Sequence, residues 1–300
     1  MNREALASIS RTMTELHERV LAWYADHARA LPWREESASP WAVLVSEFML
    51  QQTPVTRVLP VYGRWMQLWP TPADLAAATS GDAVRAWGRL GYPRRALRLH
   101  QVATAIVGEH EGRVPSRLDQ LRALPGVGDY TAAAVATFAF GQRHAVLDTN
   151  VRRVLARAVA GVELPAKAVT RPERDLATGL LPGATSTATA WAVGVMELGA
   201  LVCTAGSPKC DECPIKDLCA WRLAGYPAYD GPPRRAQTFI GTDRQCRGML
   251  LRIVRETSEA VHRSRLDLVW GNDEQRDRCL VSLLEDGLVV RRSEETYALP

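Results

Sequence analysis

Long hydrophobic runs are missing from this 300-residue chain, and no apolar stretch reaches the ~20 residues that a membrane-spanning helix needs. The first ten residues, MNREALASIS, also lack the apolar core of a secretory signal peptide. We therefore expect a protein that has no membrane partner and works in the cytoplasm, where thiols stay reduced. Its six cysteines are accordingly expected to be free or metal-bound rather than paired in disulfides.

Strand-like alternation is nearly absent before residue 220, and internal repeats and low-complexity tracts are absent throughout. Instead, helical segments of ordinary length follow one another from residue 5 to about residue 220, joined by short turns rich in proline and glycine. This pattern predicts an all-α core. The polar, proline-rich residues 226–239 predict a linker after it.

Residues 240–300 have a different texture. Three short helices are expected over 247–256, 263–270 and 273–285, followed by a hairpin that contains Val289 and Val290 in one strand and residues 297–299 in the other. Three helices and a hairpin predict a winged-helix-like module of mixed α and β structure. Such modules bind DNA in some proteins and serve as packing or dimer domains in others, so the architecture alone assigns no role.

The net charge of +4 is modest but unevenly distributed. Eight arginines lie from Arg85 to Arg122, against only Glu109, Glu111 and Asp119. A basic stripe of this kind suits DNA phosphates, because each neutralised phosphate releases condensed counterions. A solvated, arginine-rich helix face would have the same composition, so charge alone leaves both interpretations open.

Four cysteines gather near residue 210. They are Cys203, Cys210, Cys213 and Cys219, with six, two and five residues between successive thiols. A tetrahedral zinc site is one candidate, although zinc ribbons usually pair two CxxC units and this array contains one. A [4Fe–4S] cluster also takes four thiolates and tolerates uneven spacing. The spacing therefore favours iron without excluding zinc.

Two carboxylates and a glycine-rich turn are further candidates for function. Glu47 is the only charged residue in the apolar stretch WAVLVSEFML: buried there, its pKa would rise and it could act as a general acid, whereas at a helix edge it would face water. Asp148 directly precedes a predicted helix, where aspartate is a favoured N-cap. The turn LPGVG at 124–128 also precedes a helix, and its backbone N–H groups can hold a phosphate.

Together these segments resemble the MutY family of adenine DNA glycosylases, within the helix-hairpin-helix iron–sulfur glycosylases. MELGALVC at 196–203, with the cysteines after it, resembles the loop that holds a [4Fe–4S] cluster. LPGVG followed by LDTNV resembles the hairpin and catalytic aspartate, and SEFMLQQTPV at 46–55 resembles the adenine-site motif. The resemblance covers about residues 10–225. It implies a glycosylase core of two helical subdomains, one [4Fe–4S] cluster, and duplex DNA with a mispaired adenine as partner.

The resemblance also implies roles for single residues. Glu47 is expected to protonate the departing adenine, Asp148 to stabilise the positive sugar, and Tyr130 to assist Asp148. Further residues expected to contact adenine or DNA, or to support the site, are Trp33, Arg34, Gln51, Gln52, Thr53, Tyr92, Gly126, Val127, Gly128, Asn150, Glu197 and Lys209. The implied cluster ligands are Cys203, Cys210, Cys213 and Cys219, and carbonyls of the hairpin turn can hold a small cation.

Tyr130 separates this chain from its nearest alternative. Endonuclease III-type enzymes have a lysine at the matching position, and a phenol cannot form the Schiff base that leads to strand cleavage. Tyr130 and the pair Gln51 and Gln52 therefore argue against an endonuclease III-like glycosylase for oxidised pyrimidines. A second alternative is a non-catalytic iron–sulfur DNA-binding protein in which Glu47 and Asp148 are merely core and cap.

The expected organisation is an iron–sulfur subdomain from 1–34 and 141–225, a six-helix subdomain with the hairpin from 35–140, the linker and the module. Many family members carry a larger domain after the core that reads 8-oxoguanine, and residues 240–300 lack its Gly-rich, Glu-rich signature. The base opposite the adenine is thus open between 8-oxoguanine, guanine and cytosine. We favour 8-oxoguanine because SEFMLQQT and Tyr92 match core residues that touch it, and we expect a nucleoid-associated monomer.

Overall fold

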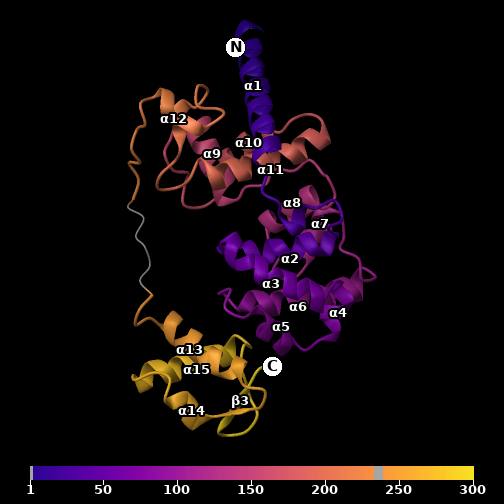
Figure 1. The fold of residues 1–300 in the computed structure, drawn as a ribbon, viewed down its shortest axis with the longest axis vertical. Helices are drawn as coiled ribbons and strands as arrows, with labels where there is room; N and C mark the ends of the chain where they lie inside the picture. Colours follow the sequence, from indigo (N-terminus) through magenta and orange to yellow (C-terminus); the bar gives the residue numbers. More distant parts are fainter. Residues whose placement is uncertain (1–2, 233–238) are drawn as a thin grey trace. The chain divides into compact units, whose positions relative to one another are not determined.

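A computed structural model describes residues 3–232 and 239–300 of the chain, so part of the predicted linker, 233–238, lies outside the described residues (Figure 1). In chain order the elements are α1 (Arg3–His27), η1 (Pro32–Arg34), α2 (Pro40–Leu50), α3 (Val55–Leu68), α4 (Pro72–Ala77), α5 (Ser80–Trp87), α6 (Arg94–Glu109), α7 (Leu118–Ala123), α8 (Asp129–Phe138), α9 (Thr149–Ala158), α10 (Arg171–Gly179), α11 (Thr185–Leu201), η2 (Cys210–Glu212), α12 (Ala220–Leu223), α13 (Asp243–Glu256), β1 (Val261–His262), α14 (Arg263–Asp267), α15 (Asp273–Glu285), β2 (Val290–Arg291) and β3 (Thr296–Ala298). The predicted all-α core is confirmed. None of the described helices combines the length and apolarity needed to span a bilayer.

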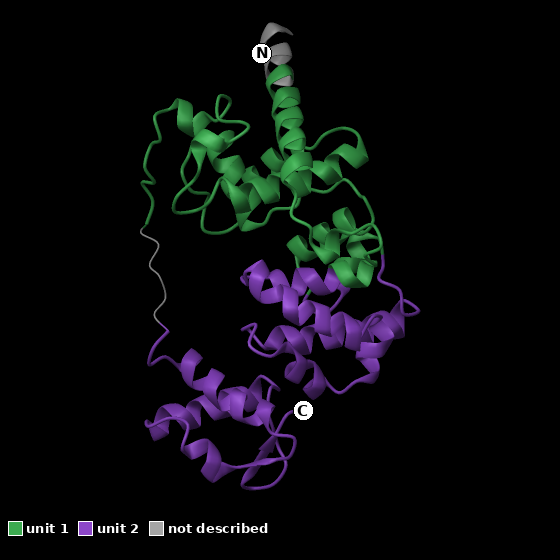
Figure 2. Ribbon diagram, in the orientation of Figure 1, with its two compact units in different colours: residues 1–43, 116–122, 127–232 green, residues 44–115, 123–126, 233–300 purple. Residues whose placement is uncertain are grey.

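The chain forms two compact units, coloured green and purple in Figure 2. Unit 1 comprises residues 1–43, 116–122 and 127–232, and unit 2 comprises 44–115, 123–126 and 233–300. The iron–sulfur and six-helix subdomains expected from the sequence remain a prediction.

Unit 1 is built around α1, α9 and α11. On α1, Leu16, Val20 and Trp23 recur at intervals of four and three, which places them on one helix face, and all three are buried. They join Val154 of α9 and Val195 of α11 in one apolar core. Because α11 is apolar on all sides, it can pack against α1 and α9 at once.

The helical part of unit 2 packs α6 against α4 and α5. The side chains of Leu99, Val102 and Ile106 on α6 are fully buried, as is Trp87 of α5, whose ring lies 5.5 Å from that of Trp65 in an edge-to-face arrangement. Both α4 and α5 begin with a complete capping box, so these short helices have well-satisfied N-termini. This packing fixes the loop between α5 and α6.

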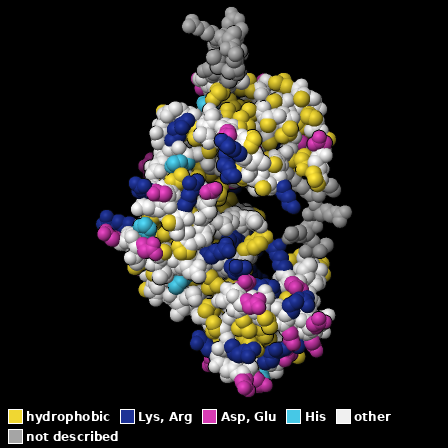
Figure 3. All heavy atoms as spheres, turned by 180° about the vertical axis from the view of Figure 1, so that it is seen from behind, with side chains coloured by type: hydrophobic (Ala, Val, Ile, Leu, Met, Phe, Trp, Pro, Cys, Tyr) yellow, Lys and Arg dark blue, Asp and Glu magenta, His cyan; other side chains and the backbone are white. Residues whose placement is uncertain are grey.

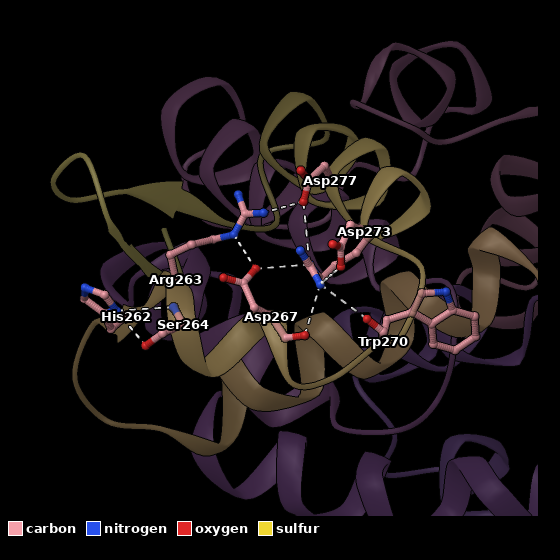
Figure 4. Close-up of polar contacts among 8 residues, drawn as sticks. His262, Arg263, Ser264, Asp267, Trp270, Asp273 and Asp277 are labelled. Carbon is pink, nitrogen blue, oxygen red and sulfur yellow. Dashed lines mark hydrogen bonds and ion pairs between the residues drawn. The ribbon is translucent and has the colours of Figure 1, made fainter.

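The last part of unit 2 is a small module of three helices and three strands. The predicted hairpin is confirmed, with Val290 paired to Ala298, and β1 adds a third strand that the sequence did not reveal because it is only two residues long. An ion-pair network joins α14 to α15: Asp267 pairs with Arg263 at 2.6 Å and with the buried Arg276 at 3.1 Å (Figure 4). The predicted winged-helix-like module is therefore present.

Candidate active site

Asp148 occupies the N-terminus of α9 in unit 1. Its Oδ1 accepts a 2.6 Å hydrogen bond from the backbone N–H of Val151, and its Oδ2 accepts one of 2.7 Å from Asn150 Nδ2. The residue is thus a true N-cap, and both oxygens have fixed donors. Burial raises the pKa of Asp148, while the hydrogen bonds from Val151 and Asn150 oppose that rise. The result is an oriented carboxylate with restricted access to water.

Arg153 connects this carboxylate to the cysteine loop. Its Nη2 donates to Asn150 Oδ1 at 2.8 Å and to the Gly199 carbonyl at 2.6 Å, and its Nε donates to the Cys203 carbonyl at 2.6 Å. A Cβ on Gly199 would lie 2.7 Å from the Cβ of Asn150, so only glycine allows α11 to approach α9 this closely. Sequence reasoning missed both Arg153 and Gly199, because neither a buried arginine nor a helix contact has a local signature.

Tyr130 lies in the first turn of α8, in the same unit as Asp148. Its half-buried ring packs against a small apolar cluster of Ala134, Val146 and Ala192. Val146 precedes Asp148 by two residues, so the segment that leads to the carboxylate and the helix that carries Tyr130 share one patch of core.

Glu197 is fully buried on α11 between two arginines. Its carboxylate accepts from Arg29 Nε at 2.6 Å and from Arg34 Nη2 at 2.8 Å. Burial raises the pKa of Glu197, but these two hydrogen bonds outweigh it and lower the value to about 2. Glu197 is therefore a buried ion-pair partner of both arginines and not a surface residue of α11. The neighbouring Trp33 is buried as well, so its ring is a packing group of unit 1.

The hairpin turn lies where the chain passes between the units. Gly126 has φ of 72°, a left-handed conformation that favours glycine, whereas Gly128 has an extended backbone and is the N-cap residue of α8 without a side-chain cap. Val127 between them is buried and anchors the turn. The first N–H groups of α8 thus have no capping side chain, as a phosphate seat requires. A cation at this turn remains a prediction.

Glu47 lies on α2 in unit 2. Its side chain is 4% exposed and that of the adjacent Ser46 is 0% exposed, so the interpretation in which both face water is wrong. The burial of Glu47 is the placement that the general-acid hypothesis requires.

Arg95 fastens the end of α2 to the loop before α6. Its guanidinium donates to the Phe48 carbonyl at 2.9 Å, to Thr53 Oγ1 at 3.0 Å and to the Gly91 carbonyl at 3.1 Å. It therefore satisfies a carbonyl at the C-terminus of α2. Desolvation lowers the pKa of Arg95 to about 10, which reflects how completely the group is enclosed. Thr53 is accordingly a buried partner of Arg95 rather than an exposed contact residue.

Two of the expected DNA contacts have strained backbones. Gln52 and Tyr92 have φ of 54° and 47°, in the left-handed region that side chains other than glycine rarely adopt. Both side chains are exposed, and with Gln51 they line a groove of unit 2. Such strain persists only where the surroundings impose it, and it is often associated with functional sites. Arg95 holds the neighbours of both residues: it donates to Thr53 Oγ1 next to Gln52 and to the Gly91 carbonyl next to Tyr92.

The four cysteines line one pocket of unit 1. Arg157 spans the loop around it, donating to the Thr204 carbonyl at 2.7 Å and lying 3.5 Å from Cys203 Sγ. Burial raises the pKa of Cys213 to about 12, so thiolates become stable there only beside a positively charged metal centre. Four thiols around one pocket fit a cluster with four thiolate ligands. Lys209 is 57% exposed at the edge, 3.4 Å from Glu212.

Comparisons with known proteins agree with the fold and the cysteine pocket described above. Residues 45–174 match the profile of the HhH-GPD superfamily base excision DNA repair protein, and residues 203–219, which contain all four cysteines, match the iron-sulfur binding domain of endonuclease III.

Adenine DNA glycosylases are among the similar curated proteins. That of Mycobacterium tuberculosis is 54% identical over 94% of this chain and 92% of its own length, and that of Mycolicibacterium smegmatis is 52% identical over 93% and 94%. A solved structure of a thermostable thymine-DNA glycosylase superposes with a TM-score of 0.66 at 26% identity, covering 72% of this chain and 99% of that one. The chain belongs to the adenine DNA glycosylase family of the HhH-GPD superfamily, and its cofactor is a [4Fe–4S] cluster.

Proposed function

We propose that this protein excises adenine mispaired with 8-oxoguanine or guanine from duplex DNA, using Glu47 and Asp148 as its two carboxylates. The observation that carries the proposal is the contrast between them. Glu47 is 4% exposed on an apolar helix, whereas Asp148 accepts two hydrogen bonds that counter the rise in its pKa caused by burial. Glycoside cleavage needs one carboxyl group that donates a proton and a second that is ionised, and we assign the first role to Glu47 and the second to Asp148.

In the proposed reaction the adenine first leaves the base stack, which costs least at a mispair. Glu47 donates its proton to a ring nitrogen of the base as the bond between the sugar and the base breaks and its electron pair passes to the adenine. The ionised Asp148 stabilises the oxocarbenium-like sugar, with Asn150 holding it and Tyr130 assisting. Water adds to the sugar carbon, and its released proton restores Glu47.

The iron–sulfur cluster has a supporting part in this proposal: bound by the four thiolates, it orders the loop from 203 to 219 and performs no step of the hydrolysis. Arg157 and Arg153 hold that loop through its carbonyls. Lys209, exposed at the edge of the loop, is available to contact a DNA phosphate.

The test is excision from a duplex with one adenine opposite 8-oxoguanine, followed by alkali to cut the abasic strand. Wild type should cleave, and Glu47→Gln and Asp148→Asn should each lose about 10²-fold or more in single-turnover rate. Glu36→Gln, a change at an exposed acid, is the matched control. Cleavage by Glu47→Gln at the wild-type rate would overturn the assignment. Before alkali, borohydride should trap no adduct, because Tyr130 cannot form an imine.

For the opposite base we propose a preference for 8-oxoguanine over guanine and cytosine, supported by the exposed, strained positions of Gln52 and Tyr92. Equal single-turnover rates opposite all three bases would contradict it. We further propose a monomer that acts in the cytoplasm on nucleoid DNA, where reducing conditions keep the cluster thiols available. Light scattering of the purified protein measures whether it is a monomer. Fluorescence imaging of the tagged chain measures where it is located.

A further inference from the structure

The groove that Gln52 and Tyr92 line has the C-terminal module as its other wall. It has a volume of about 1250 Å³ and runs between residues 88–98 and α13, all within unit 2. Among the described residues, nine arginines line it, against a single carboxylate, that of Asp286. Figure 3 shows dark blue basic side chains around a hollow in the lower half of the molecule. We call this feature the arginine groove.

Some of the arginines hold the module in place. Arg255 donates to the Gly88 carbonyl, and Arg85, outside the groove, donates to the Thr257 carbonyl at 3.1 Å. Arg94 of α6 and Arg247 of α13 both pair with Asp286, at 3.2 and 2.5 Å. The carboxylate of Asp286 is thus neutralised by two arginines, one from α6 and one from α13.

Other arginines of the groove have no such partner. No carboxylate in the described part of the chain lies within ion-pair distance of Arg98, Arg244 or Arg252. The Nε of Arg252 is buried and makes no hydrogen bond within residues 3–232 and 239–300. A buried donor without an acceptor costs free energy, and several unpaired cations in one groove repel one another. A polyanion bound in the groove would remove the repulsion among these cations.

Tyr92 projects at the same place. Its ring is 41% exposed on a strained backbone, and the Arg244 guanidinium lies 4.8 Å from the ring centroid. The module thus steadies this ring from α13 by a cation–π contact, while Arg95 does so at 5.3 Å from the helical core. Arginines beside an exposed aromatic ring are typical of surfaces that follow a nucleic-acid strand.

We propose that the arginine groove binds backbone phosphates of the DNA duplex, with Arg244 and Arg252 of the C-terminal module and Arg98 of α6 as the phosphate ligands. The module is then part of the DNA-binding surface, and Arg244 also sets the position of Tyr92. This inference rests on the proposed function for its substrate, but its own observations are the unpaired arginines and the groove.

The test compares two double variants with equal charge loss on the module. Arg244→Gln with Arg252→Gln removes groove cations, and Arg265→Gln with Arg292→Gln removes two exposed cations that do not line the groove. Binding is measured by fluorescence anisotropy with a 30-base-pair duplex holding adenine opposite 8-oxoguanine, at several salt concentrations. The groove variant should bind about tenfold more weakly at 0.1 M salt, and its plot of log K against log salt should flatten by about two, since each lost phosphate contact contributes about 0.9.

The control variant should keep the wild-type slope and bind within about twofold of wild type. Equal binding by the two double variants would overturn the inference. Arg252→Lys keeps the charge and should retain most of the affinity, which separates lost phosphate binding from disturbed folding; thermal unfolding checks the same point. The two proposals fail separately: excision by wild type with no groove effect refutes only the groove, whereas a groove effect without excision refutes only the proposed function.

Discussion

At the scale of single residues, the N-cap role of Asp148 does not compete with the catalytic role that we propose for it. An N-cap must accept a hydrogen bond from the first turn of its helix, and the same bond orients and stabilises a carboxylate. Val151 and Asn150 supply one donor for each oxygen. The N-cap predicted for Asp148 is therefore confirmed, and the same hydrogen bonds suit the catalytic role that we propose for its carboxylate.

This arrangement predicts a pH effect. Burial raises the pKa of Asp148, so excision should decline on the acid side at a higher pH than an ordinary aspartate would give. Asn150→Ala removes a hydrogen bond that lowers this pKa, so the acid limb should move to still higher pH, with rates on that limb about tenfold below wild type. Single-turnover rates from pH 5 to 9 measure it. Thr149→Ala, at the exposed neighbour, should leave the limb in place; an unmoved limb in Asn150→Ala would contradict the argument.

A second prediction concerns the close approach of α9 and α11 at Gly199 in unit 1. Gly199→Ala places a methyl group 2.7 Å from both the Cβ and the carbonyl oxygen of Asn150, so α9 must shift and take Asp148 with it. We expect the excision rate to fall about 10²-fold, since displacement by an ångström has effects of that size. Gly179→Ala, where nothing lies within 4 Å, should be neutral. Similar rates for the two variants would show that the close contact is not important.

At the scale of elements, buried arginine side chains hold the helix ends and loops in position. Arg95 joins the end of α2 to the loop before α6, and Arg153 joins α9 to α11 and to the cysteine loop. Both guanidiniums donate mainly to backbone carbonyls, whose geometry does not depend on side-chain identity. Helix ends that would otherwise leave carbonyls unpaired are thereby held at fixed separations.

The hairpin turn allows a matched pair of changes. Gly126→Ala forces a left-handed residue, which costs about 1 kcal/mol, and should lower the thermal midpoint by about 2–4 °C. Gly128→Ala has an ordinary φ and open space around its Cβ, so the midpoint should not change. If DNA approaches the backbone here, both variants should bind duplex DNA severalfold more weakly. Wild-type binding by Gly128→Ala would remove the phosphate seat from the proposal.

At the scale of the whole molecule, unit 2 combines the core helices with the C-terminal module. The contact is close: a Cβ on Gly81 of α5 would lie 2.2 Å from the Pro300 carbonyl oxygen. Arg85 and Arg255 donate hydrogen bonds to carbonyls across the same junction. A larger side chain at Gly81 would therefore push the end of the module away from α5.

Gly81→Ala should loosen this attachment. Because the clash is with backbone rather than a flexible side chain, the module must shift, and we expect faster hydrogen exchange in α13 and earlier proteolytic cleavage near residue 240. Gly63→Ala lies in α3 with open space around its Cβ and should be neutral or stabilise the helix by up to ~1 kcal/mol. Equal exchange in the two variants would mean that the junction tolerates the shift.

The sequence by itself determined the elements and the chemistry of this protein. Helical periodicity and Pro/Gly turns define an all-α core, the helix over 273–285 was located to the residue, and the hairpin was found, because these features are local. The cysteine spacing pointed to a metal centre for the same reason. The two-residue strand β1 escaped, since it exists only through its pairing with β3.

Only the tertiary structure decided which of those side chains are buried and which groups they contact. Local sequence cannot tell whether a lone glutamate on a helix faces water, so the burial of Glu47 and Glu197 had to come from packing. Arg95, Arg153 and Gly199 owe their importance to partners 40 or more residues away. The arginine groove has the same origin: α6 and α13 are far apart in sequence, and their unpaired cations become one surface only because the module packs against the core.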